Sequence, residues 1–63
     1  MTVFFQDKDE FVLFRTEDSP VIPITGESVR IEGKWYKVID RTFYYKHLKN
    51  MDSNSCTIWV EEE

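Results

Sequence analysis

The sequence predicts an all-β protein, built as a five-stranded, strongly bent antiparallel sheet or a small open barrel of the SH3-like or OB-like type. Three observations lead to this class. Short apolar runs rich in β-branched and aromatic residues alternate with turn-forming residues along the chain. No segment has the periodicity and the capping residues of a convincing helix. The length of 63 residues allows one domain, residues 1–63.

The first two strands are expected to form a hairpin. Apolar runs at Val3–Phe5 and Phe11–Phe14 flank the polar stretch Gln6–Glu10. These runs are short and continuous, and no capping box precedes them, so a strand is favoured over a helix.

The next segment, residues 18–28, is predicted to be extended but not a central strand. Pro20 and Pro23 each remove a backbone donor that a central strand needs. A turn follows at Thr25–Gly26–Glu27. We expect the β-branched residues of this segment to cover one open end of the core; they are Val21, Ile22 and Ile24.

The clearest element is a second hairpin, with a tight turn at Glu32–Gly33–Lys34. Alternation on both sides of this turn predicts one buried face, made of Val29, Ile31, Tyr36 and Val38.

Beyond Val38 the alternation becomes ambiguous. If it continued, Asp40 would lie on the core face. A bulge near Ile39–Arg41 would instead turn Phe43 and Tyr45 inward and would bend the strand, as a small barrel requires.

The last part of the chain is predicted to contain a polar loop at residues 46–55 and a final strand. Cys56, Ile58 and Val60 alternate on one face of that strand, and Trp59 lies on the other. The three terminal acidic residues, Glu61–Glu63, are expected to fray.

Composition restricts what can stabilise so small a domain. A single cysteine excludes a disulfide within the chain, and Cys56 with His47 is too small a set for a structural zinc site. A well-packed aromatic core or self-association remains. The lone thiol, with no signal peptide and no long apolar run, predicts a cytoplasmic protein without a membrane partner.

The run from Pro23 to Val38, PITGESVRIEGKWYKV, resembles a pattern of very small β proteins of phages, prophages and Gram-positive accessory genomes. Those proteins share a "P-x-x-G-E-x-V-x-I-x-G-x-x-Y-x-V" segment before a further strand. The resemblance covers about a quarter of the chain and contains no catalytic residue. It implies a phage or prophage protein that works by binding.

Two groups of residues are candidates for a chemical site. Cys56 and His47 could pair as a nucleophile and its base, but Cys56 falls among core positions. Asp7, Asp9 and Glu10 lack the glycine and the distal glutamate of a calcium loop, and a solvated hairpin turn explains them better. We therefore expect no enzyme activity, no cofactor and no metal.

The strongest functional signal is a basic and aromatic segment. Residues 30–49 hold six Lys and Arg against two acidic residues, whereas the chain has a net charge of −4. Aromatic and arginine side chains are common anchors of protein interfaces, and aromatics beside a positive groove also bind single-stranded nucleic acid. The candidate binding residues are Arg30, Trp35, Lys37, Arg41, Tyr44, Tyr45 and Trp59.

The functional hypothesis is a non-enzymatic interaction protein that binds a host protein or a second copy of itself as a homodimer. Ten aromatic residues are more than a core of this size easily buries, which favours a protein-binding surface. A bent sheet that buries both faces at its bends is the purely structural alternative. A single-stranded nucleic-acid-binding module is the second functional hypothesis, and a structural virion subunit is the third.

Overall fold

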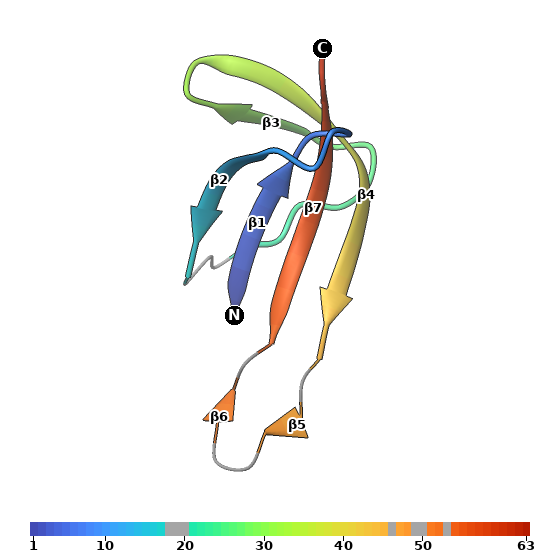
Figure 1. Ribbon diagram of the computed structural model, residues 1–63. Coiled ribbons are helices and arrows are strands. Elements are labelled where there is room, and N and C mark those ends of the chain that lie inside the picture. Colours follow the sequence, from blue (N-terminus) through green and yellow to red (C-terminus); the bar gives the residue numbers. More distant parts are fainter. Residues whose placement is uncertain (18–20, 46, 49–50, 53) are drawn as a thin grey trace.

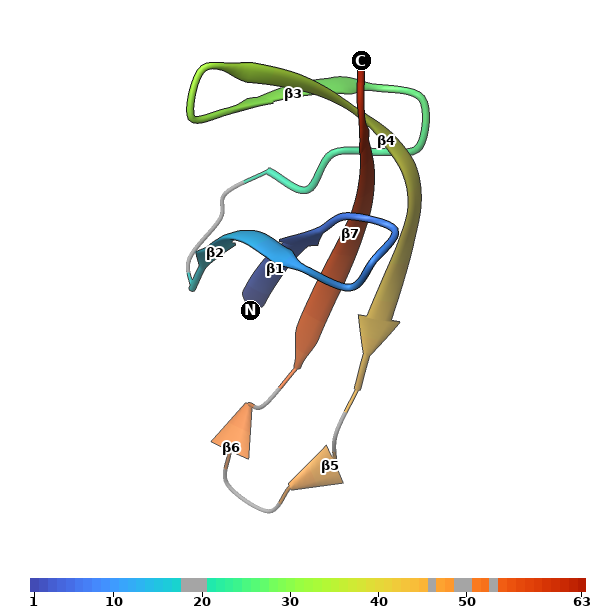
Figure 2. The same cartoon turned by 45° about the horizontal axis from the view of Figure 1, so that its top comes forward.

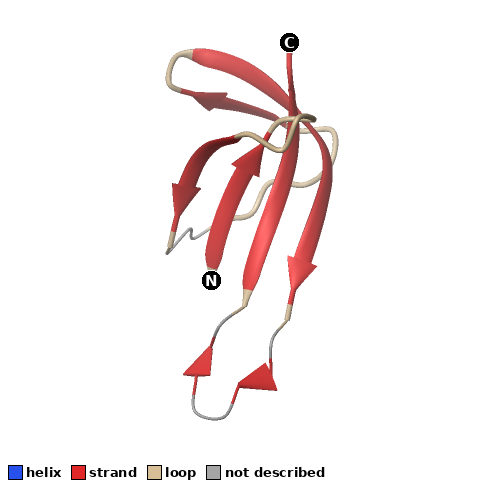
Figure 3. Cartoon of the chain, viewed as in Figure 1, coloured by secondary structure: helices blue, strands red, loops and turns tan. Residues whose placement is uncertain are grey.

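A computed structural model describes residues 1–17, 21–45, 47–48, 51–52 and 54–63, with the backbone alone at 47–48 and 51–52. Every element in this part is a strand, as Figure 3 shows, and the all-β class is confirmed. None of the described residues forms a helix with the length and hydropathy to cross a membrane. The strands are β1 (Thr2–Gln6), β2 (Val12–Thr16), β3 (Ser28–Ile31), β4 (Lys34–Tyr44), β5 (His47–Leu48), β6 (Met51–Asp52) and β7 (Ser55–Glu62).

Five strands form one sheet in the order β2-β1-β7-β4-β3, which curls into a half-barrel (Figures 1 and 2). The predicted bent sheet is therefore confirmed, with one difference. β1 runs parallel to β7, whereas the other pairings in the sheet are antiparallel. This pairing sets Val3 beside Cys56 and Phe5 beside Ile58, so the buried residues of both strands lie on one face.

The β3–β4 hairpin forms around a two-residue turn. Glu32 and Gly33 both have positive φ, 48° and 86°, as a type I′ turn requires. The twist of this turn matches the twist of the two strands. The predicted buried face is confirmed, because Ile31, Tyr36 and Val38 are buried and Val29 packs against them.

The proposed bulge is present in β4. Val38 pairs with Val60 and Asp40 pairs with Trp59, which leaves Ile39 as the extra residue. Phe43 therefore packs against the core, as predicted. Tyr45 lies beyond the end of β4 and is 73% exposed, so the expectation that it turns inward was wrong. Its ring stacks on that of Phe43.

The core lies on the concave side of the half-barrel. Ile22 packs against it, but Val21 and Ile24 are exposed, so only one of the three β-branched residues covers the core. The segment is held by its own turn, where the Ile24 amide donates to Glu27 Oε1, and by β4, where the Val38 carbonyl accepts from the Gly26 amide. The core residues are Val3, Phe5, Ile31, Tyr36, Val38, Cys56, Ile58 and Val60.

Two expectations about the last part of the chain were wrong. Residues 47–48 and 51–52 pair as β5 and β6, an arm that extends beyond the sheet in Figure 1, where a loop was expected. Residues 46, 49–50 and 53 lie outside the described part. Glu61 and Glu62 continue β7 opposite Lys37 and Tyr36, and the Glu63 amide donates to the Trp35 carbonyl, because β4 is long enough to pair with them.

Candidate functional site

The bulge at Ile39 decides on which face of β4 each candidate residue lies. Before it, Trp35 and Lys37 alternate with buried residues and therefore lie on the convex, outer face. After it, Tyr44 pairs with Ser55 on that same face. Arg30 lies opposite Trp35, and Trp59 alternates with buried residues of β7. Five candidates thus share the outer face, and we call them the outer cluster: Arg30, Trp35, Lys37, Tyr44 and Trp59.

Arg30 and Trp35 lie at the end of the outer cluster that is nearest the β3–β4 turn. The guanidinium carbon of Arg30 lies 5.6 Å from the centre of the Trp35 ring, and the ring is 50% exposed. This distance permits a cation–π contact. The face is not uniformly basic, because Lys37 lies opposite both Ser28 and Glu61, and the Ser28 hydroxyl donates to Glu63 Oε1.

Trp59 and Tyr44 lie at the other end of the outer cluster, beyond the bulge of β4. The Trp59 Nε1–H donates to Thr42 Oγ1 at 3.3 Å, which holds the half-buried indole against β4. Thr57, the next residue of β7 on this face, is only 4% exposed although it faces away from the core. The outer face is therefore partly covered by its own side chains at β7, while Tyr44 remains exposed.

Arg41 and Tyr45 do not belong to the outer cluster, and the expectation that Arg41 shares the face of Trp35 and Lys37 was wrong. The bulge sets Arg41 opposite Ile58, on the concave side of the sheet. Its guanidinium carbon lies 5.3 Å from the centre of the Phe43 ring. Tyr45 stacks on the same ring at 6.3 Å with a 13° interplanar angle. Unbroken alternation would have placed Arg41 beside Lys37.

Cys56 is a core residue, as its pattern predicts. Its side chain is fully buried between core positions of β7. Burial raises the pKa of the Cys56 thiol, and the nearby charge of Arg41 opposes this effect in part. A thiol that is both inaccessible and harder to ionise is a poor nucleophile. The backbone of His47 lies in β5, and its side chain is outside the described part, so the Cys56–His47 pair stays untested.

The acidic residues of the β1–β2 turn have a structural role. Asp7 Oδ1 accepts hydrogen bonds from the amides of Asp9 and Phe11, at 2.9 and 3.0 Å. The Glu10 amide donates to the Asp7 carbonyl, and Glu10 itself has a φ of 63°. Within the described residues, no group of three His, Cys, Asp or Glu side chains could hold a metal ion.

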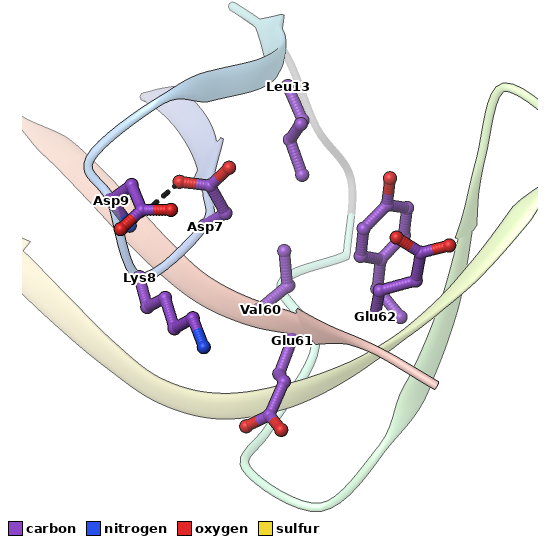
Figure 4. A pocket seen from close by; sticks show the side chains of 8 residues that line it. Asp7, Lys8, Asp9, Leu13, Val60, Glu61 and Glu62 are labelled. Carbon is purple, nitrogen blue, oxygen red and sulfur yellow. Dashed lines mark hydrogen bonds between the residues drawn. The ribbon is translucent and has the colours of Figure 1, made fainter.

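Two surface features were not predicted from the sequence. The edge strand β2 and the residue before it expose three large apolar side chains: Phe11, Val12 and Phe14. Their signal was the unbroken apolar run Phe11–Phe14, which leaves apolar residues on both faces of one strand. The second feature is an open cavity of about 410 Å³ between the β1–β2 turn and the end of β7 (Figure 4). It depends on the parallel β1–β7 pairing, which has no local signal in the sequence.

A scan of protein-family models finds no match to the chain. Searches of curated proteins and of solved structures likewise return no significant match.

Proposed function

We propose that this chain is a non-enzymatic interaction protein that binds another protein through its outer cluster. The observation that carries the proposal is the distribution of apolar side chains. Within the described part of the chain, ten large hydrophobic residues are exposed, whereas eight hydrophobic residues form the buried core. Two of the exposed residues, Trp35 and Tyr44, lie on the outer face with Arg30, and exposed aromatic side chains together with arginine are typical of protein interfaces.

The outer cluster has the composition of an interface anchor. Trp35 and Tyr44 are each about half exposed, and Trp and Tyr can bury a large area while retaining a polar group. Arg30 is held beside Trp35 and can form charged hydrogen bonds at the rim. Because these side chains are carried by paired strands, binding requires little ordering of the backbone.

The distribution of charge favours a protein over single-stranded nucleic acid as the partner. Arg30 beside Trp35 is a suitable platform for a base, and this pair supports nucleic acid as the second candidate. However, Lys37 lies opposite Glu61, and Glu63, which follows β7, accepts a hydrogen bond from Ser28 on the outer face. A phosphate backbone that follows the outer face would meet these carboxylates.

A second copy of the chain is one possible protein partner. The edge strand β2 carries exposed Phe11, Val12 and Phe14, and an exposed apolar edge can pair with another strand. Such pairing would add stability to a domain whose core is small. The proposed setting is the cytoplasm, which agrees with a free cysteine, and the phage or prophage origin is proposed from the Pro23–Val38 pattern alone.

The experiment compares capture by the whole chain with capture by two double variants. Trp35→Ser with Tyr44→Ser removes two aromatic side chains of the outer cluster, and Ile24→Ser with Val21→Ser removes exposed apolar side chains elsewhere. A specific protein from source-cell lysate should be retained by the second variant and lost by the first. Loss from both variants, or from neither, would contradict the outer cluster as the site.

A fluorescence titration separates the two candidate functions. Trp35 is half exposed. If single-stranded oligonucleotides stacked on it, they would quench its fluorescence at low salt, and added salt would reverse the quenching. We expect no quenching. Salt-sensitive quenching that Trp35→Ser abolishes would replace the proposal with the nucleic-acid function.

A further inference from the structure

The cavity beside the β1–β2 turn combines an apolar floor with a carboxylate rim. Leu13 and Val60 line it, and Figure 4 shows both side chains between Asp7 and Glu62. The carboxylate of Glu61 is directed away from Leu13 in the same view. The acidic groups that remain at the rim are therefore Asp7, Asp9 and Glu62.

Tyr36 supplies an independent sign that the cavity receives a polar ligand. It lines the cavity and is only 8% exposed. Its hydroxyl makes no hydrogen bond to any other group in the described part of the chain. A buried tyrosine hydroxyl normally has a partner, because leaving it unpaired costs about 1–3 kcal/mol. Because Tyr36 lines the cavity, a ligand bound there could supply this partner.

The groups at the rim keep free acceptor capacity. Asp7 uses Oδ1 for the two turn amides, and no hydrogen bond to its Oδ2 is described. Glu62 has a single long ion pair with Lys34, at 4.0 Å. Lys8 also lines the cavity, but its Nζ is within 4.0 Å of no carboxylate among the described residues. The cavity is thus acidic on balance, and its own lysine does not neutralise it.

From these features we propose that the cavity binds the side chain of an arginine or lysine presented by a protein partner. The aliphatic part of such a side chain can pack against Leu13, the partly exposed apolar residue of the floor. Its cationic end meets Glu62 and Asp7, and an N–H donates to the Tyr36 hydroxyl. A metal ion does not fit, because it requires converging oxygen ligands and the described residues offer no group of three.

This inference rests on the proposed function and adds the chemistry of the partner: a basic side chain that enters the cavity on the concave side, opposite the face that carries the outer cluster. The two proposals can fail separately, since the cavity shares no residue with the outer cluster. A cavity that binds no cation would leave the capture experiment unchanged. A failed capture experiment would equally leave a positive cation titration standing.

The test is an NMR titration of the whole chain with N-acetyl-arginine amide, N-acetyl-lysine amide and N-acetyl-citrulline amide. Citrulline has nearly the shape of arginine without its charge. We expect saturable shifts at the amides of Leu13, Tyr36, Val60 and Glu62 with the two cations, at millimolar dissociation constants, and none with citrulline. Equal shifts with citrulline would overturn the proposal.

Variants assign the binding to the cavity. Glu62→Gln should weaken cation binding about threefold to tenfold, and Lys8→Gln should strengthen it. Tyr36→Phe removes only the hydroxyl and should weaken binding about twofold to tenfold. Glu32→Gln, an exposed carboxylate of the β3–β4 turn, is the matched control and should change nothing. Binding that Glu62→Gln and Glu32→Gln affect equally, or shifts at these amides with Mg²⁺ of similar affinity, would contradict the proposal.

Discussion

Arg30 and Trp35 face each other across the β3–β4 hairpin, with the guanidinium carbon 5.6 Å from the centre of the indole ring. Both lie on the outer face, so their contact links β3 to β4 independently of the packing in the core. A double-mutant cycle with Arg30→Ala and Trp35→Ala should give a coupling free energy of about 0.5–1 kcal/mol in urea unfolding. Arg15→Ala with Trp35→Ala is the control and should be additive, because Arg15 lies in β2, over Phe4.

The type I′ turn of the same hairpin makes a second prediction. Gly33 has a φ of 86°, and nothing lies within 4 Å of the place where a Cβ would be. Gly33→Ala should therefore cause no steric clash. It should lower the free energy of unfolding by about 1–2 kcal/mol, because alanine adopts a positive φ less readily than glycine. Glu32→Asn should stabilise it, because asparagine adopts the positive φ of Glu32 more readily. Urea unfolding midpoints that move in the opposite order would contradict this turn.

Replacing the isoleucine of β4 and that of β7 should change the stability of the fold by very different amounts. Ile58 is fully buried at the centre of the core, whereas Ile39 is the exposed extra residue of the bulge. Ile58→Ala should cost about 2–5 kcal/mol, enough to unfold much of so small a domain at room temperature. Ile39→Ala should cost under about 1 kcal/mol. Circular dichroism with thermal unfolding measures both, and similar losses would contradict the assigned core.

The Cys56 thiol predicts a loss of stability at alkaline pH. Its pKa in the folded state is raised above the ordinary value of 9.0, mainly by burial and against the effect of Arg41. The folded chain then holds its proton more tightly than the unfolded chain. The free energy of unfolding should therefore fall as the pH rises above about 9, and should be unaffected by this group below that pH.

Other groups titrate in the same range, so the comparison is with Cys56→Ala. The unfolding free energy of the native protein, relative to that of Cys56→Ala, should be constant below about pH 9 and fall above it. Native Cys56 should also react slowly with a thiol reagent and quickly in urea. Rapid reaction of the folded protein would show that the thiol is accessible.

Local patterns predicted what local interactions determine. The Glu32–Gly33 turn, the buried pair Tyr36 and Val38 and the alternation along β7 follow from neighbours in sequence, and all are present. The bulge at Ile39 was recognisable because Asp40 would otherwise have faced the core. Its consequence for Arg41 was missed, since one extra residue reverses the face of every residue that follows it.

Features that depend on distant segments were not predictable. The parallel alignment of β1 with β7 joins the two ends of the chain, and no nearby residue specifies its direction. The acidic cavity combines Asp7 and Glu62 through that alignment. The pairing of Glu61 and Glu62 was missed because their composition indicates a solvated tail, while the length of β4 provides partners for them.

The place of β1 between β2 and β7 has a kinetic consequence. Val3 adjoins Cys56, so the central contacts of the sheet join residues from opposite ends of the sequence. Closing so large a loop costs entropy before any core contact compensates for it. Folding should therefore be slow for a chain of this size, on the order of milliseconds to seconds. Until residues 55–59 are available during synthesis, the β1–β2 hairpin has no strand to pack beside and leaves Val3 and Phe5 exposed to water.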